Sequence, residues 1–306
     1  MSRNAQGTIF ALICVTLWGL TFIFSRVLLD AGATPYEILL SRFILAWACL
    51  SLLKPKGVPF EGFKKEIPYI GAGIFGVSLY FIFENTALMH TKVANVGVLA
   101  DLAPIFTALA FWLVYGFKPQ ARFFLGFVIS LMGVVLVSTG GNFSEISPSF
   151  LGDALAILAA ITWAGYSISI REIRMGSFEP KTEDSGEIKE FDSLAVTKRI
   201  FFWGIISAFF MFPFMSVDFS WICNGGPVVW ANLGFLALGG SALNYVLWNL
   251  AIEKLGEVKS SLYLYLIPVV TVVASFLFLG EQLNLASIAG IIAVLVGLVI
   301  SSKGSF

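Results

Sequence analysis

The most constraining feature of this chain is a succession of apolar runs, each long enough to cross a bilayer, over nearly its whole length. Hydrophobic residues make up 58% of the 306 residues and charged residues 12%, against about 25% charged residues in a soluble domain. A soluble fold could not cover so much apolar surface with polar groups, so we expect lipid to be the solvent. Because lipid offers the backbone no hydrogen-bond partners, the runs are predicted to be helices.

Ten transmembrane helices are predicted from the apolar runs and from the glycine and proline residues between them. Their expected limits are 8–29, 36–53, 67–88, 94–115, 122–139, 151–172, 199–217, 227–251, 259–279 and 286–302. The longest connection, at about 173–198, is strongly charged and is expected to be a solvated cytoplasmic loop. The expected fold class is an all-α integral membrane protein without a soluble domain.

The distribution of lysine and arginine predicts the orientation of these helices, because short cytoplasmic segments carry an excess of both. With the N-terminus in the cytoplasm, sixteen of the nineteen Lys and Arg residues fall in inner segments. Lys92 falls outside, while Arg26 and Arg42 lie within apolar spans. Ten helices would then put both termini in the cytoplasm. The expected location of the protein is the cell (cytoplasmic) membrane.

The second half of the pattern repeats the first. When Asn85–Gly133 is aligned with Asn249–Gly297 without a gap, eleven of the 49 pairs are identical. The identical pairs include Asn85/Asn249, Pro104/Pro268, Gly116/Gly280, Gly126/Gly290 and Gly133/Gly297. Apolar composition alone would not align one proline and three glycines in a single register. We therefore expect two repeats, at 1–140 and 141–306. Because each would hold five spans, the two would be inverted in the membrane, as in many transporters.

Short motifs recur at comparable places in the two halves. They are Trp18-Gly19 and Trp163-Ala164, the stretches Leu102–Leu109 and Leu266–Val270, and the glycines of the fifth and tenth spans. The ninth predicted span ends in a further motif, Phe278–Glu281. Their order, spacing and duplication resemble the drug/metabolite transporter superfamily, EamA family. The resemblance implies a ten-helix carrier, often an exporter, of amino acids or other small metabolites. The first half departs from the family pattern, since Phe117 stands where the second half has Glu281.

Four charged residues lie in the outer third of the predicted first half: Arg26, Arg42, Glu84 and Asp101. Charges inside a span are costly, so these residues are candidates for function. Two cations and two anions at similar depth are expected to pair with one another. The functional hypothesis is an outer ion-pair gate, in which a zwitterionic substrate or a proton competes for the partners. The alternatives are arginines that snorkel to the headgroups and a static packing pair.

The repeat assigns basic counterparts to the two arginines and uncharged ones to the acids. The aligned pairs are Arg26/Arg171, Arg42/Arg199, Glu84/Trp248 and Asp101/Tyr265. Because the halves would be inverted, one pair of arginines would lie near the outer surface and its counterpart near the inner surface. We therefore expect an outer mouth of mixed charge and a mainly basic inner mouth.

Polar and aromatic residues near the midplane are candidates for lining a substrate cavity, because aromatic rings with a few polar tips suit amphipathic ligands. The candidates are Trp18, Tyr80, Trp163, Tyr166, Asn244, Tyr245, Asn249, Tyr263 and Tyr265. Ordinary packing is the alternative for each. The repeat retains an amide at Asn85 and Asn249, for which a helix–helix hydrogen bond is the alternative. Pro104 and Pro268 are hinge candidates, or fixed kinks needed for packing.

The chain lacks the motifs that carry chemistry in other classes of protein. A GxxxxGK[ST] phosphate loop is missing, so transport would not be driven by an ATPase within this chain. One His and three scattered Cys do not have metal-ligand spacing. We expect no cofactor, no metal and no catalytic residue. The net charge of zero predicts no nucleic-acid partner.

The leading interpretation is a secondary transporter of a small-molecule substrate, with the lipid bilayer as its other partner. Its driving force would be the substrate gradient, exchange or a coupled proton, and it would be a monomer or a homodimer. One alternative is a carrier of the same fold for an anionic substrate, either a nucleotide sugar or a lipid-linked compound. A membrane-embedded enzyme and a receptor are the alternatives from other classes.

Overall fold

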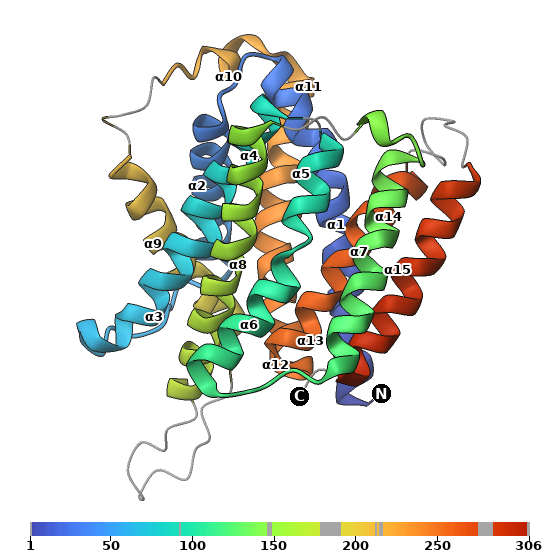
Figure 1. Ribbon diagram of the computed structural model, residues 1–306. Coiled ribbons are helices and arrows are strands. Elements are labelled where there is room, and N and C mark those ends of the chain that lie inside the picture. Colours follow the sequence, from blue (N-terminus) through green and yellow to red (C-terminus); the bar gives the residue numbers. More distant parts are fainter. Residues whose placement is uncertain are drawn as a thin grey trace, which may run out of the picture.

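The computed structural model describes residues 2–91, 93–145, 149–177, 191–211, 213, 217–274 and 284–304. Within these residues every regular element is a helix, and the helices form one bundle (Figure 1). The elements are α1 Arg3–Asp30, α2 Pro35–Leu53, α3 Phe63–Gly73, η1 Ile74–Leu79, α4 Tyr80–His90, α5 Val93–Ala100, α6 Ala103–Tyr115, α7 Ala121–Thr139, η2 Phe143–Glu145, α8 Phe150–Ser177, α9 Ser193–Phe209, α10 Ser220–Asn224, α11 Gly226–Gly234, η4 Phe235–Leu243, α12 Asn244–Leu255, α13 Glu257–Leu262, η5 Tyr263–Tyr265, α14 Leu266–Ala274 and α15 Leu285–Gly304. The first helix begins and the last helix ends at the same end of the bundle, which we call the terminal end; the opposite end is the far end.

Eight helical segments of the described chain are long and apolar enough to cross a membrane. They are Arg3–Asp30, Pro35–Leu53, Phe63–His90, Asn95–Tyr115, Ala121–Thr139, Phe150–Gly176, Gly226–Leu255 and Leu285–Gly304. The predicted seventh span corresponds to α9, which has 17 residues. The predicted ninth span corresponds to α13, η5 and α14, and its last residues lie outside the described part of the chain. The expectation of an all-α membrane protein is confirmed, while the number ten stays a prediction.

The expected loop at 173–198 was placed too widely at both ends. Helix α8 continues to Ser177, and Arg174 near its end donates to the Glu257 carboxylate at 2.7 Å. Helix α9 begins at Ser193, where the Asp192 side chain accepts from the Ala195 N–H at 3.0 Å. Charged residues that suggested a loop are therefore capping or paired groups of helices. The expected charges at 178–190 lie outside the described residues.

Two pairs of spans depart from regular α-helix at positions that the internal repeat aligns. The π-helical stretch Ile74–Leu79 aligns with 238–243, which lies inside the π-helical stretch Phe235–Leu243. The turn at Asp101–Leu102, between α5 and α6, aligns with the end of the 3-10 turn Tyr263–Tyr265. Such interruptions inside spans are frequent at functional sites, because they redirect side chains and free backbone groups.

Helix contacts occur in matched pairs across the two halves. The first helix, α1, packs on α12 and α14, and its counterpart α8 packs on α4 and α6. Likewise α2 packs on η4 while α9 packs on η1, and α2 and α9 also contact each other. Each half therefore contributes its first two spans to the surface of the other half.

Helices α7 and α15 pack side by side at one edge of the bundle through glycines (Figure 1). A Cβ added at Gly133 would lie 2.7 Å from the Gly290 carbonyl oxygen, and one added at Gly290 would lie 2.8 Å from the Gly133 carbonyl oxygen. Added at Gly126 it would meet the backbone of Gly297, and the reverse also holds. The contact Gly126–Gly297 becomes Gly290–Gly133 when aligned residues are exchanged. The two helices are antiparallel, and their contact is reciprocal.

Candidate functional site

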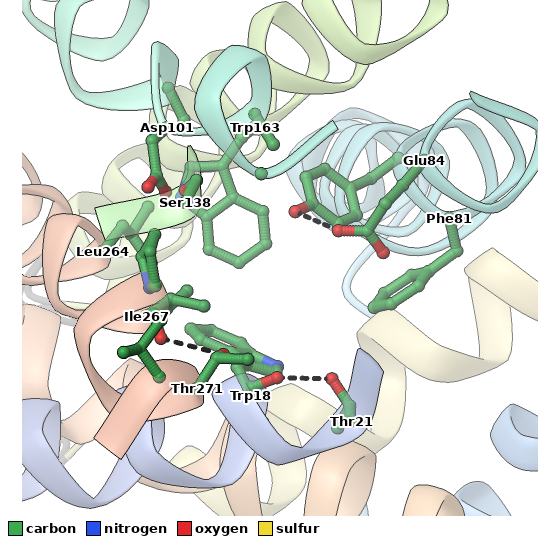
Figure 2. Close-up of a pocket in the computed structure, with 16 residues that line it drawn as sticks. Trp18, Thr21, Phe81, Glu84, Asp101, Ser138, Trp163, Leu264, Ile267 and Thr271 are labelled. Atoms are coloured by element: carbon green, nitrogen blue, oxygen red, sulfur yellow. Dashed lines mark hydrogen bonds between the residues drawn. The ribbon is translucent and has the colours of Figure 1, made fainter. Parts of the chain in front are cut away.

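A cavity of about 450 Å³ lies between the two halves (Figure 2). Its described lining comes from α1, α4, α5, α6, α7, α8, η5 and α14, and from the turn that holds Asp101. The lining residues are Trp18, Thr21, Tyr80, Phe81, Glu84, Gly97, Ala100, Asp101, Ala103, Ser138, Trp163, Leu264, Ile267, Pro268, Thr271 and Val272. The two spans that are interrupted by aligned turns border the cavity, one at Asp101 and the other at Leu264. This volume suits a small organic ligand.

Aromatic rings from both halves form one side of the cavity, which we call its floor. The Trp18 ring meets Trp163 edge-on at 5.3 Å and Trp248 at 5.0 Å between ring centroids. Tyr80 lies 5.2 Å from Trp163, and Tyr166 lies 5.0 Å from it. These rings come from α1, α4, α8 and α12, so the cluster joins both halves. In the other direction the cavity reaches Ser138, the last residue but one of α7, a helix that starts at the terminal end beside Gly304.

Two carboxylates border the cavity, and they differ in their partners. The Glu84 side chain is buried and accepts a hydrogen bond from the Tyr80 hydroxyl at 2.8 Å. Asp101 is 5% exposed, and its Oδ2 has no hydrogen-bond partner among the described residues. Figure 2 shows the two carboxylates apart, with the Trp163 ring between them in the view. Trp163 Nε1 is a second buried polar atom of the lining without a partner among the described residues.

Arg42 lies behind the cavity wall and is 1% exposed. Its Nε donates to Ser241 Oγ at 2.9 Å and its Nη2 to the Gly240 carbonyl at 3.3 Å. The guanidinium also lies over the Phe81 ring, 4.4 Å from the centroid, and this ring faces the cavity. The Arg42 and Glu84 charges interact at a distance. No ion pair within 4.0 Å joins them among the residues described.

Arg26 does not belong to this group of charges. Its side chain is 62% exposed and pairs with Asp30, one helical turn further along α1, at 2.9 Å. The expected mutual pairing of Arg26, Arg42, Glu84 and Asp101 is therefore wrong. Residue spacing placed the four charges at one depth, but the rotation of each helix about its axis decides which of them meet.

The expected excess of basic charge around Arg171 and Arg199 is also wrong, because acids compensate these arginines at the terminal end. Arg171 lies 3.7 Å from the Glu257 carboxylate, and Arg174 lies 2.7 Å from it. Arg199 makes two hydrogen bonds to Glu66, at 2.9 and 2.5 Å. Both acids are buried against helices from which the arginines extend.

The remaining predicted residues divide between packing positions and the cavity. Asn249 accepts from Tyr166 at 2.7 Å and donates to Thr197 at 3.0 Å, which is the helix–helix tie that we gave as its alternative. Asn85 and Tyr265 are fully buried outside the described cavity lining, and Asn85 Nδ2 and Tyr265 Oη have no partner in the described chain.

The two prolines also differ. Pro104 is the second residue of α6, directly after the turn at Asp101–Leu102, so it lies in the first turn of a helix. Pro268 is the third residue of α14 and borders the cavity. Sequence reasoning missed Thr21, Phe81, Ser138 and Thr271. Only Thr271 had a usable signal, because the repeat aligns it with Thr107.

A helical bundle with eight apolar spans and a cavity between two similar halves defines a multi-pass membrane protein of the transporter class. The family described as "EamA-like transporter family" matches residues 5–139 and 150–303. The chain belongs to this family, and it is a multi-pass protein of the cell membrane.

Curated relatives cover most of the chain. The "Uncharacterized transporter YyaM" of Bacillus subtilis (strain 168) is 27% identical over 269 residues, which is 85% of this chain and 82% of the relative. An "Uncharacterized transporter" of Archaeoglobus fulgidus is 26% identical over 95% of this chain and 96% of its own length. The "Probable terminal-alkyne amino-acid exporter" of Streptantibioticus cattleyicolor is 24% identical over 88% of this chain and 84% of its own length.

A solved crystal structure superposes on the chain with a TM-score of 0.72 at 17% identity, covering 98% of both chains. This likeness concerns the fold alone. The family and the curated relatives show that the chain is a membrane transporter, with a small molecule as its substrate and a bilayer around it.

Proposed function

We propose that this protein is a secondary transporter that exports small metabolites by alternating access, with the substrate bound in the cavity beside Trp18 and Trp163. The observation that carries the proposal is the cavity itself, which is lined by both halves and by the turns at Asp101 and Leu264 inside two spans. Its aromatic floor joins side chains of both halves. A site between two halves can face either side of a membrane when the halves rock against each other.

The proposal includes ten spans arranged as two inverted five-helix repeats, 1–140 and 141–306. Matched helix contacts and the reciprocal glycine packing of α7 on α15 support this arrangement. A helix that contacts its own counterpart in an antiparallel, reciprocal manner is related to it by a two-fold axis, and such an axis in the membrane plane inverts the halves.

With both termini in the cytoplasm, the cavity would extend toward the outer face, and the inner side would be closed. Ties between the halves support a closed terminal end. Arg3 donates to the Glu253 carbonyl at 2.8 Å, and the Thr8 and Tyr263 hydroxyls lie 2.9 Å apart. Access from the cytoplasm would require these ties to break.

Amino acids or other small metabolites are the proposed cargo, and the amino-acid exporter among the relatives supports this class. Carriage of an anionic nucleotide sugar or lipid-linked compound has less support, since the described cavity lining holds two carboxylates and no basic side chain. The proposal includes no enzymatic activity. A proton that exchanges with substrate at Glu84 or Asp101 is the proposed source of coupling, and a monomer or homodimer would suffice.

Counterflow in reconstituted vesicles tests this function. Vesicles loaded with a mixture of amino acids and amines should accumulate labelled solute in a protein-dependent way, and a pH gradient should change the rate. Trp18→Ala should reduce this flux because it removes the ring at the floor of the cavity. Asp30→Asn, on the same helix but exposed and outside the lining, is the control. If no solute moves through correctly inserted protein, the proposal fails.

A further inference from the structure

The charges of the cavity narrow the class of ligand, and this step rests on the proposed function. We propose that the cavity binds the ammonium group of an organic amine, with the Asp101 carboxylate as its counterion and the rings of Trp18, Tyr80, Phe81 and Trp163 around it. The ligand is therefore a monocation with an apolar or aromatic body. A carboxylate on the same ligand would have no cationic partner in the described lining.

The first support is the unsatisfied Asp101 carboxylate. Its side chain is buried at a turn inside a span and borders the cavity, where Oδ2 has no donor among the described residues. A buried acceptor without a donor costs free energy, so a donor from the ligand would contribute strongly to the free energy of binding. Glu84 is less available, because one of its oxygens already accepts from Tyr80.

The second support is the absence of an opposing charge around the cavity. Among the described lining residues none is Lys, Arg or His. The nearby guanidinium of Arg42 donates to Ser241 and Gly240 and lies behind the Phe81 ring. An anion would meet two carboxylates, and the donors that the described lining offers are all neutral, among them Trp163 Nε1 and the Ser138 hydroxyl.

The third support is the aromatic wall. Trp18 and Trp163 meet at nearly right angles, and Tyr80 and Phe81 stand beside them, with 5.1 Å between the two ring centroids. The faces of aromatic rings attract cations, most strongly where water is excluded. A carboxylate and several rings around one cavity therefore match a cation that carries an apolar body.

The repeat indicates that this feature belongs to one half only. The counterpart of Asp101 is Tyr265, which carries no charge at neutral pH and lies outside the described lining. Glu84 likewise aligns with Trp248. The carboxylates are therefore additions of the first half to a scaffold that both halves share, as expected for groups that select a ligand.

Three probes with the same ring and different charge test the proposal: phenethylamine, phenylalanine and 3-phenylpropionate. Their binding to the purified full chain in lipid nanodiscs is measured by calorimetry and by quenching of tryptophan fluorescence. Phenethylamine should bind most tightly and 3-phenylpropionate most weakly. A gap of about tenfold or more is expected, because a hydrogen bond between charged groups is lost.

Variants then assign the effect to one carboxylate. Asp101→Asn should weaken phenethylamine about tenfold or more while 3-phenylpropionate binds no worse. Asp101→Glu keeps the charge and should retain most of the preference, even if its affinity falls. Asp30→Asn makes the same chemical change outside the cavity and should leave all three affinities unchanged. Thermal unfolding of each variant confirms that it is folded.

Three results would overturn the proposal: equal or tighter binding of 3-phenylpropionate, undiminished phenethylamine binding by Asp101→Asn, or no binding of any probe. Counterflow separates this inference from the proposed function. Vesicles that move other solutes but show no preference for amines refute only the amine site. Vesicles that move nothing refute the transporter, whatever the binding order.

Discussion

The glycine contact between α7 and α15 gives the sharpest test of the two-fold arrangement. Gly133→Ala would place a Cβ 2.7 Å from the Gly290 carbonyl oxygen and 2.7 Å from the Val294 nitrogen, whereas ordinary contact begins at 3.4 Å. Both neighbours are backbone, so the helices must separate locally by about 0.7 Å. Overpacking of this kind costs about 1–3 kcal/mol. The substitution should therefore lower the unfolding temperature although alanine favours helix.

A matched control comes from Gly234→Ala in α11, where the added Cβ meets nothing within 4 Å. This change should be neutral or stabilise by up to about 1 kcal/mol, because alanine has the higher helix propensity. Unfolding of purified variants is followed in lipid nanodiscs by tryptophan fluorescence during heating. Gly297→Ala, at the aligned position of α15, should destabilise about as much as Gly133→Ala. The reasoning is refuted if Gly133→Ala is no less stable than Gly234→Ala, or if the two aligned substitutions differ widely.

Three further outcomes follow from single contacts. Glu66→Gln should lower the free energy of unfolding by about 1–3 kcal/mol, because it leaves Arg199 without its counterion. Adding Arg199→Gln should recover part of this loss. A double-mutant cycle in which the two effects simply add would contradict the pairing. Ser138→Cys, in a chain without its native cysteines, should react from outside whole cells with an impermeant maleimide, whereas a cysteine at the terminal end should not; the reverse pattern would refute the orientation. Burial raises the pKa of Asp192, but the hydrogen bonds from Lys54 and the Ala195 N–H outweigh it and hold this pKa below its ordinary value of 3.8. A lowered pKa stabilises the fold above the ordinary value, and this gain declines as pH falls through the folded-state pKa, so Lys54→Gln should lower the unfolding temperature more at pH 7 than at about pH 3. An equal deficit at both would exclude the ion pair as its cause.

Part of the candidate site could be predicted from the sequence. Glu84 and Asp101 were found because charges inside apolar spans are rare and costly, and both border the cavity. Trp18, Tyr80, Trp163 and Pro268 also border it. The positions that failed are those where a role depended on a partner. Nothing in the spacing of Arg26 shows that it turns toward Asp30 and away from the bundle.

The same limit explains the terminal end. The prediction of a basic mouth at Arg171 and Arg199 ignored Glu257 and Glu66, which lie far away in sequence. The helix ends at Ser177 and Ser193 were missed for the same reason, because charge was taken as a sign of a loop. A charge with a buried partner can remain on a helix.

The sequence by itself determined the helical class, the places of the spans and the likeness between the halves. The reason is that lipid offers the backbone N–H and C=O groups no hydrogen-bond partners, and that a duplication leaves aligned glycines and prolines. Only the tertiary structure decided which charges meet and which rings form the floor of the cavity. It also decided that Arg42 is held by Ser241, while Asp101 keeps an oxygen without a partner among the described residues. These depend on the rotation and packing of whole helices, which neighbouring halves impose on each other.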